Sequence, residues 1–194
     1  GEPLSTIEDK IISANAYLGS EGIVQALKND ADFIITGRVA DPSLFLAPMI
    51  HEFDWNIKDY DKLGKGTLVG HLLECAGQVS GGYFAHPNIK NVPDLWDIGF
   101  PYVEIDETGS GYITKVDSTG GIINTATCTE QLLYEIHDPA NYLTPDCITD
   151  FSSVDFELTE KDVVKFSNAT GKEATNTYKV SVGYLNGFYG EGQI

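Results

Sequence analysis

An arginine and an aspartate stand three residues apart after an apolar run, in a stretch that contains Thr36, Gly37, Arg38 and Asp41. The planar guanidinium of an arginine can bind a carboxylate or a phosphate through two parallel hydrogen bonds. Arg38 is the only arginine among 12 basic residues, in a chain whose formal net charge is −17. The stretch therefore predicts a site for a small anion. Asp41 is a candidate for proton transfer there, and the alternative is that it caps the next helix or pairs with Arg38.

A second polar side chain comes at the end of an earlier apolar run. Asn15 lies in residues 11–16, which read as a strand, and its amide offers both donors and acceptors. Ligands of open α/β sheets bind outside the carboxyl ends of the strands. The sequence thus predicts one ligand-binding edge that holds Asn15, Thr36, Gly37 and Arg38.

A histidine, a glutamate and a cysteine share one face of the helix predicted over residues 66–79. His71, Glu74 and Cys75 occupy positions i, i+3 and i+4 of that helix. An imidazole beside a carboxylate has the parts for acid–base catalysis, so His71 and Glu74 join Asp41 as candidate catalytic residues. The alternative is a partly solvated helix face. Cys75 fits better as a small apolar residue than as a nucleophile.

A glycine-containing loop forms the last candidate, with the sequence Ser118, Thr119, Gly120 and Gly121. Paired glycines allow a backbone to approach a ligand, and free N–H groups can cradle a phosphate. The loop lacks the spacing and the lysine of a Walker A motif. We predict it as a second contact to the ligand. No histidine–carboxylate spacing predicts a metal site, and no GxSxG elbow is present.

Alternating elements in the first half predict an α/β fold. Residues 11–16 and 31–36 read as strands, and residues 21–29 and 42–52 read as helices. This order predicts a βαβα lobe with a parallel sheet, in which the run 31–36 is buried on both faces.

The second half is richer in strands. A hairpin is predicted over 102–116, and Thr127 with Glu130 reads as a capping box that opens a helix. Residues 163–166 are expected to pair with 178–185. The composition changes near residue 100, which predicts an α/β lobe (1–100) followed by an α+β, strand-rich lobe (101–194), unless the whole chain is one continuous domain.

Charge and composition exclude several classes of partner. An excess of 29 acidic over 12 basic residues disfavours nucleic acids and anionic membranes. No run of about 18 apolar residues predicts a transmembrane helix. Three widely spaced cysteines without a CxxC motif indicate neither a disulfide framework nor a zinc knuckle, so a reduced, cytoplasmic setting is expected.

Longer motifs run through nearly the whole chain. They are 13–19 (SANAYLG), 36–44 (TGRVADPSL), 50–53 (IHEF), 70–75 (GHLLEC), 81–84 (GGYF), Gly120-Gly121 and 129–139 (TEQLLYEIHDP). Together they resemble the acyclic terpene utilisation family, the AtuA-like proteins. The resemblance implies that the chain is an internal portion of a longer protein, truncated at both ends.

The resemblance also implies a role in the degradation of acyclic terpenoids such as citronellol and geraniol, through branched acyl-CoA thioesters. Lyase-type cleavage of a branched hydroxyacyl-CoA is one candidate reaction. A coenzyme A thioester is the implied substrate, whereas no catalytic residue and no firm cofactor carry over from the family. Two interpretations stay open: an enzyme acting on branched acyl-CoA or a related small acid, and a non-catalytic subunit or ligand-binding module. The second would partner another pathway enzyme, and a homo-oligomer is also open.

Overall fold

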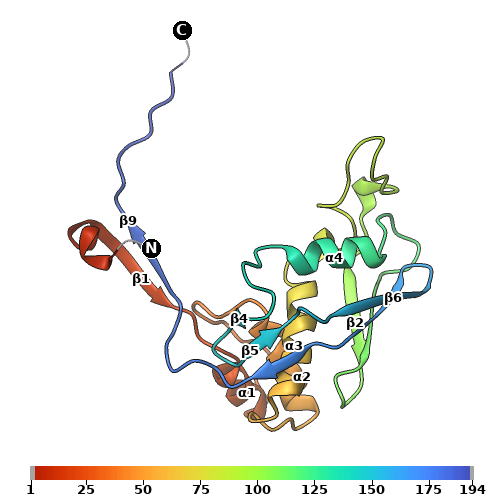
Figure 1. Cartoon of the computed structure of the whole chain (residues 1–194), viewed down its shortest axis with the longest axis horizontal. Helices are drawn as coiled ribbons and strands as arrows, with labels where there is room; N and C mark the ends of the chain where they lie inside the picture. Colours follow the sequence, from red (N-terminus) through yellow and green to blue (C-terminus); the bar gives the residue numbers. More distant parts are fainter. Residues whose placement is uncertain (1–2, 193–194) are drawn as a thin grey trace.

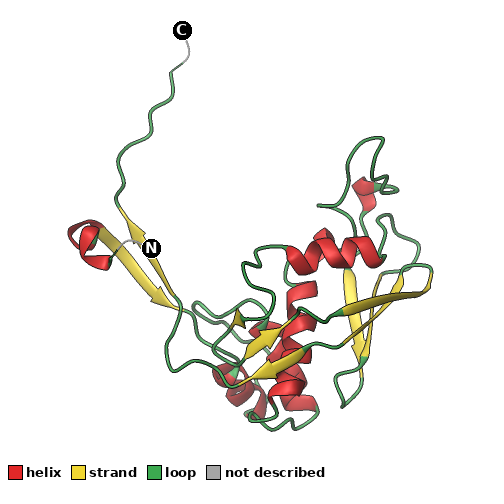
Figure 2. Cartoon of the chain, in the orientation of Figure 1, coloured by secondary structure: helices red, strands yellow, loops and turns green. Residues whose placement is uncertain are grey.

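Four α-helices and nine short strands make up the computed structural model, which describes residues 3–192. The helices are α1 (Glu21–Lys28), α2 (Ser43–Glu52), α3 (Tyr60–Leu73) and α4 (Thr125–Leu133). The strands are β1 (Ile11–Ala16), β2 (Pro101–Ile105), β3 (Gly111–Lys115), β4 (Tyr142–Leu143), β5 (Ile148–Asp150), β6 (Asp155–Glu160), β7 (Val163–Ser167), β8 (Thr170–Lys172) and β9 (Val180–Tyr184). The mixture of helices and sheets confirms the predicted α/β class (Figure 2).

Helix α3 forms the centre of the fold (Figure 1). Its residues Leu63, Leu68 and Leu72 are almost completely buried. They belong to one apolar cluster that also takes in Ile23 of α1 and Val164 of β7. Burial of aliphatic side chains is the main source of stability, and here both halves of the chain contribute to it. The domain boundary near residue 100 stays a prediction.

Glycines let other backbone segments approach α3 closely. A Cβ atom on Gly64 would lie 2.4 Å from the carbonyl oxygen of Thr170, at the start of β8. A Cβ atom on Gly70 would lie 2.5 Å from the carbonyl oxygen of Pro42, just before α2. Both distances are shorter than any carbon–oxygen contact that side chains tolerate, so only glycine fits at either position. Helix α3 therefore packs backbone to backbone on two sides.

The named strands pair only antiparallel within residues 3–192. Strand β1 pairs with β9, the order β2-β3-β7-β6 forms a second sheet, and β4-β5-β8 forms a third. The parallel contacts in this part of the chain are two isolated bridges, Leu18–Val39 and Ile98–Gly120. The parallel sheet predicted for the first lobe is therefore not formed.

Residues 31–36 do not form the predicted strand. This segment lies outside every strand, and Phe33 and Ile35 are 93% and 98% exposed. Strand β1 is paired with β9 instead, and the only parallel bridge near this segment joins Leu18 and Val39, which follow β1 and residues 31–36 in the described chain. A strand needs a neighbouring backbone for its ladder, and an apolar run does not say which segment will supply it.

The pairing of the second half is partly as predicted. The β2–β3 hairpin is confirmed, with Val103 opposite Ile113. The predicted pairing of 163–166 with 178–185 is wrong, because β7 pairs with β6 and β3. Only two residues separate β6 from β7, and Asp162 takes a positive φ of 59° in that turn. A tight local hairpin closes at a lower entropic cost than a distant pairing.

Helix α4 begins earlier than the sequence indicated. The Asn124 side chain accepts hydrogen bonds from the N–H groups of Ala126 and Thr127, both at 2.9 Å. Thr127 closes the capping box by accepting from the Asn124 N–H at 3.0 Å. The capping box assigned to Thr127 and Glu130 is therefore wrong by three residues, since asparagine caps a helix as well as threonine does. Glu130 is left free for another contact.

The close approach at Gly64 gives a direct test of α3 packing. We expect Gly64→Ala to lower the free energy of unfolding by about 1–3 kcal/mol, because the added methyl group must displace the Thr170 backbone. Gly22→Ala in α1 is the matched control, since a Cβ atom there meets nothing within 4 Å. It should raise stability by about 0.5–1 kcal/mol through helix propensity. Urea unfolding measures both; equal effects of the two changes would contradict the packing argument.

Candidate functional site

A surface groove of about 390 Å³ brings the predicted ligand-binding edge together. It is lined by Asn15, Thr36, Gly37, Arg38, Val39, Asp41 and Leu44. We call it the Arg38 groove. The residues come from the end of β1, the loop before α2 and the start of α2. The predicted proximity of Asn15 to Arg38 is therefore present in the structure, while their binding role stays a prediction.

The backbone fixes the position of Arg38 although the predicted strand is missing. The Leu18 N–H donates to the Arg38 carbonyl at 3.0 Å, and the Ala40 N–H donates to the Leu18 carbonyl at 2.9 Å. These bonds make the short parallel bridge between residues 18 and 39. Two segments thus converge at their carboxyl ends, which is the geometry that favours ligand binding in α/β proteins.

The Arg38 guanidinium contacts Tyr17 and no carboxylate. Its Nη1 atom donates to the Tyr17 hydroxyl at 3.1 Å, and its Cζ atom lies 5.1 Å from the centre of the Tyr17 ring. The three ion pairs found among residues 3–192 do not involve Arg38. The Arg38–Asp41 pair that the spacing allowed is therefore absent from this part of the chain. The remaining donors of the exposed guanidinium are available to an anion.

Asp41 does not cap α2. Pro42 occupies the N-cap position with helical dihedrals, φ −61° and ψ −25°, and no side chain caps the helix. The first N–H groups are taken by main-chain carbonyls, from Ser43 to Ala40 at 2.8 Å and from Leu44 to Asp41 at 3.2 Å. These turn bonds leave no helix donor for the Asp41 carboxylate. The predicted capping role is wrong, and the exposed Asp41 side chain faces the groove.

His71 and Glu74 form a buried pair away from the groove lining. The His71 Nδ1 atom lies 2.9 Å from Glu74 Oε1, and its Nε2 atom lies 3.1 Å from the Leu132 carbonyl oxygen. His71 is 1% exposed and stacks on Phe151. Both ring nitrogens thus lie within hydrogen-bond distance of an oxygen atom of the chain. A buried polar ring needs such partners, and both nitrogens are therefore already occupied.

The carboxyl end of α3 lies beside Asp41. The helix ends at Leu73, so Cys75 falls outside the predicted helical face. Burial raises the pKa of the Cys75 thiol, and the nearby charges of Glu74, Glu135 and Asp41 raise this pKa further, while a hydrogen bond with Gln131 lowers it. Cys75 is therefore a neutral thiol at pH 7 rather than a nucleophilic thiolate. Asp41 and Glu135 are thus both close enough to act on the charge of the residue that follows α3.

Three residues of the predicted 118–121 loop, Thr119, Gly120 and Gly121, line a different groove, and Ser118 lines neither this groove nor the Arg38 groove. The Gly120 N–H donates to the Asp97 carbonyl at 2.8 Å, and the Gly121 N–H donates to the Pro93 carbonyl at 2.7 Å. Both N–H groups are thus used within the chain and are not free for a phosphate. The structure does not bring this loop to the Arg38 groove, so its contact with a shared ligand remains only a prediction.

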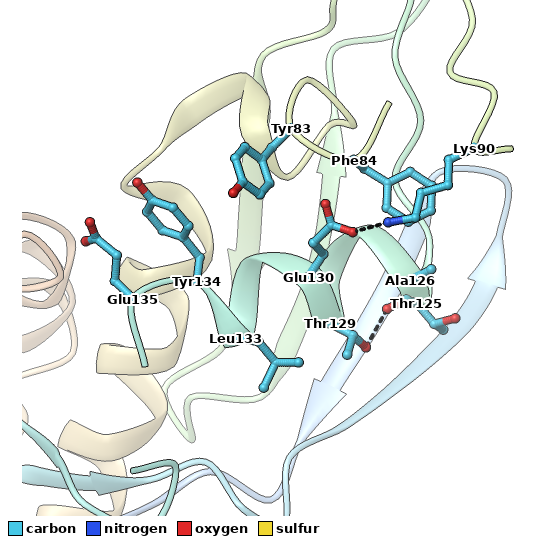
Figure 3. A pocket seen from close by; sticks show the side chains of 10 residues that line it. All are labelled: Tyr83, Phe84, Lys90, Thr125, Ala126, Thr129, Glu130, Leu133, Tyr134 and Glu135. Carbon is cyan, nitrogen blue, oxygen red and sulfur yellow. Dashed lines mark hydrogen bonds and ion pairs between the residues drawn. The ribbon is translucent and has the colours of Figure 1, made fainter. Parts of the chain in front are cut away.

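A third groove, of about 780 Å³, was not predicted (Figure 3). It lies between the 81–84 turn and α4 and is lined by Tyr83, Phe84, Lys90, Thr125, Ala126, Thr129, Glu130, Leu133, Tyr134 and Glu135. Tyr83 and Tyr134 meet edge to face at 5.7 Å. We call it the tyrosine groove.

Two of the three charged side chains of the tyrosine groove form an ion pair, and Glu135 is the third. Lys90 Nζ pairs with Glu130 Oε2 at 2.6 Å and lies 4.4 Å from the Phe84 ring centre. Glu130 is available for this pair because Asn124, not Thr127, caps α4. The groove escaped prediction because Glu130 had been assigned to the capping box. Apart from Glu135 and two threonines, the rest of its lining is aromatic and aliphatic and includes Leu133, which is 59% exposed.

Neither a metal cluster nor a membrane-spanning helix is found in residues 3–192. Within residues 3–192, no group of three or more His, Cys, Asp and Glu side chains is arranged to hold a metal ion. No helix in this part of the chain is both long enough and apolar enough to cross a membrane.

The buried pair predicts different outcomes for two changes at Glu74. Glu74→Leu leaves the His71 Nδ1 atom without a partner and should lower the free energy of unfolding by about 1–3 kcal/mol. In Glu74→Gln an amide N–H can donate to Nδ1 while Nε2–H donates to the Leu132 carbonyl, so the loss should stay below about 1 kcal/mol. Urea unfolding compares the two variants. A leucine variant as stable as the glutamine variant would show that the bond contributes nothing.

Comparison with known proteins adds one finding. The model of the family described as "Acyclic terpene utilisation family protein AtuA" matches residues 1–194, the whole chain. No curated protein and no solved structure matches the chain. A match over the full length confirms the resemblance carried by the motifs around Asn15, Arg38 and His71. The chain belongs to the AtuA family of acyclic terpene utilisation proteins.

Proposed function

We propose that the chain binds a branched acyl-CoA or a related small branched acid, as part of an enzyme of acyclic terpene catabolism. The observation that carries the proposal is the Arg38 groove. The sole arginine of this acidic chain lines the groove, and among the described residues its side chain has no carboxylate partner. Arg38 holds the anionic group, and Asn15 and Thr36 supply further polar contacts. Membership of the AtuA family supports the substrate class.

Asp41 is the residue best placed for proton transfer. Its carboxylate is exposed in the same groove as Arg38, whereas both His71 nitrogens are already bonded. In a lyase-type cleavage of a hydroxyacyl thioester, Asp41 takes the hydroxyl proton and the adjacent carbon–carbon bond breaks. The carbonyl fragment leaves, and the thioester fragment keeps the electron pair and takes up a proton.

The tyrosine groove suits the alkyl part of the same ligand. Its charge pair is internally neutralised, and its aromatic walls offer apolar surface that is otherwise exposed to water. Glu135 lines it and acts on the Cys75 thiol together with Asp41, which lines the Arg38 groove. Both carboxylates thus act on the residue that follows α3, and the proposal places one elongated ligand across the two grooves.

A non-catalytic ligand-binding subunit is the second candidate function. It is favoured by the chemistry of two side chains, since the Cys75 thiol has a raised pKa and His71 has no free nitrogen. Turnover of a branched acyl-CoA by the isolated full-length protein would exclude this alternative.

Arg38 provides the central test. With the full-length protein, Arg38→Ala should weaken binding of a branched acyl-CoA at least about tenfold, measured by calorimetry, because a charge-assisted bidentate contact is lost. Arg38→Lys keeps the charge without the planar fork and should fall in between. Lys58→Ala removes an exposed positive charge outside the groove and should change little. No heat with any thioester or branched acid, or equal losses in the alanine variants, would overturn the proposal.

Leu133 tests the alkyl groove separately. Across thioesters with acyl chains of about four to ten carbons, wild-type affinity should rise roughly threefold per buried methylene. Leu133→Asn should flatten this rise while preserving the affinity of the shortest thioester. Leu143→Asn is the matched control, because Leu143 is 57% exposed and does not line the groove. An unchanged chain-length dependence in the Leu133 variant would exclude the tyrosine groove as the chain site.

A further inference from the structure

Tyr17 holds two cations from distant parts of the chain. The Arg38 Cζ atom lies 5.1 Å from the centre of its ring, and the Lys179 Nζ atom lies 5.0 Å from the same centre. Arg38 also donates to the Tyr17 hydroxyl. Cations are attracted to the face of an aromatic ring, so Tyr17 keeps the two charges within about 10 Å of each other.

The backbone fixes this arrangement independently of the side chains. The Tyr17 N–H donates to the Lys179 carbonyl at 2.9 Å, and the next residue, Leu18, donates to the Arg38 carbonyl at 3.0 Å. The segments of Lys179 and Arg38 therefore flank the end of β1 on its two sides, each about one strand spacing, roughly 4.8 Å, away. Long side chains from both neighbours can reach a ligand that lies over the central residue.

The charges around Tyr17 point to the kind of ligand. The ion pairs among residues 3–192 include neither Arg38 nor Lys179, although the chain carries 29 acidic residues. Two like charges held close together repel each other unless an anion lies between them. A single carboxylate neutralises only one of them. Asp41 faces the groove as well, which directs the bound anion toward the Tyr17 side.

We propose that this site takes a doubly charged phosphate group, a phosphate monoester or a diphosphate, and that Lys179 selects it over a carboxylate. Arg38 binds two phosphate oxygens through its planar fork, and Lys179 adds a point charge from the opposite flank. The inference rests on the proposed function and specifies the group that Arg38 holds.

Matched probes measure the selection in the full-length protein. Isovalerate, 3-methylbutyl phosphate and 3-methylbutyl diphosphate share one branched alkyl group and differ in charge, since a monoester is largely doubly charged at about pH 7.5. We expect wild-type protein to bind at least one phosphate probe about tenfold or more tightly than isovalerate by calorimetry. Whether the monoester or the diphosphate binds more tightly identifies the source of the phosphate group.

Lys179→Gln should remove most of that preference and leave isovalerate binding within about twofold, because only the second charge is lost. The change leaves the main-chain bond from Tyr17 intact, and Lys58→Gln is the control for general loss of positive charge. Wild-type protein that binds isovalerate and both phosphates equally would overturn the inference but not the proposed function. Equal losses for all probes in Lys179→Gln would also overturn the inference. No binding of any probe would overturn both.

Discussion

The close approach of backbone segments to α3 is the constraint on which the other features depend. Gly64 admits the start of β8, and Gly70 admits the Pro42 main chain, at distances where no side chain fits. The second contact places the loop that carries Arg38 and Asp41 against the carboxyl half of α3. The groove is thus located by a helix surface that contributes no side chain to it. The packing there is between main-chain atoms, which cannot adjust by changing rotamers.

Side-chain hydrogen bonds also fix the beginnings of α1 and α2. The Asp146 carboxylate accepts hydrogen bonds from Ser20 just before α1, through its N–H at 2.8 Å and its hydroxyl at 2.6 Å, and from the Ser43 hydroxyl at 2.5 Å. One carboxylate therefore joins the beginnings of two helices, where a negative charge is favourable. On the other side of α3, Gln131 of α4 donates to the His71 carbonyl at 2.8 Å. The buried His71–Glu74 pair belongs to this framework, which supports the groove without lining it.

Positively charged side chains in this acidic chain have two kinds of partner, carboxylates and an aromatic ring. Lys90 and Lys115 each have a carboxylate partner, Glu130 at 2.6 Å and Asp162 at 3.6 Å. Arg38 and Lys179 contact the Tyr17 ring instead. An aromatic ring attracts a cation without neutralising it, so both groups keep their charge for an anion. The arrangement brings two positive charges to one aromatic ring of a net acidic protein.

Local chemistry in the sequence determined much of the fold and of the Arg38 groove. Strand β1, helices α1 and α2 and the β2–β3 hairpin follow from periodicity and turn residues, and Asn15 and Arg38 meet as the motif order predicts. Tertiary structure decided the choices between distant partners. It paired β1 with β9, left the Phe33 side chain exposed and placed Lys179 beside Tyr17. It also decided that main-chain turn bonds, and not Asp41, satisfy the first N–H groups of α2. The physical reason is that caps, turns and helical stripes are set by neighbours in the chain, whereas strand partners and charge clusters depend on which remote segments the packing around α3 brings together.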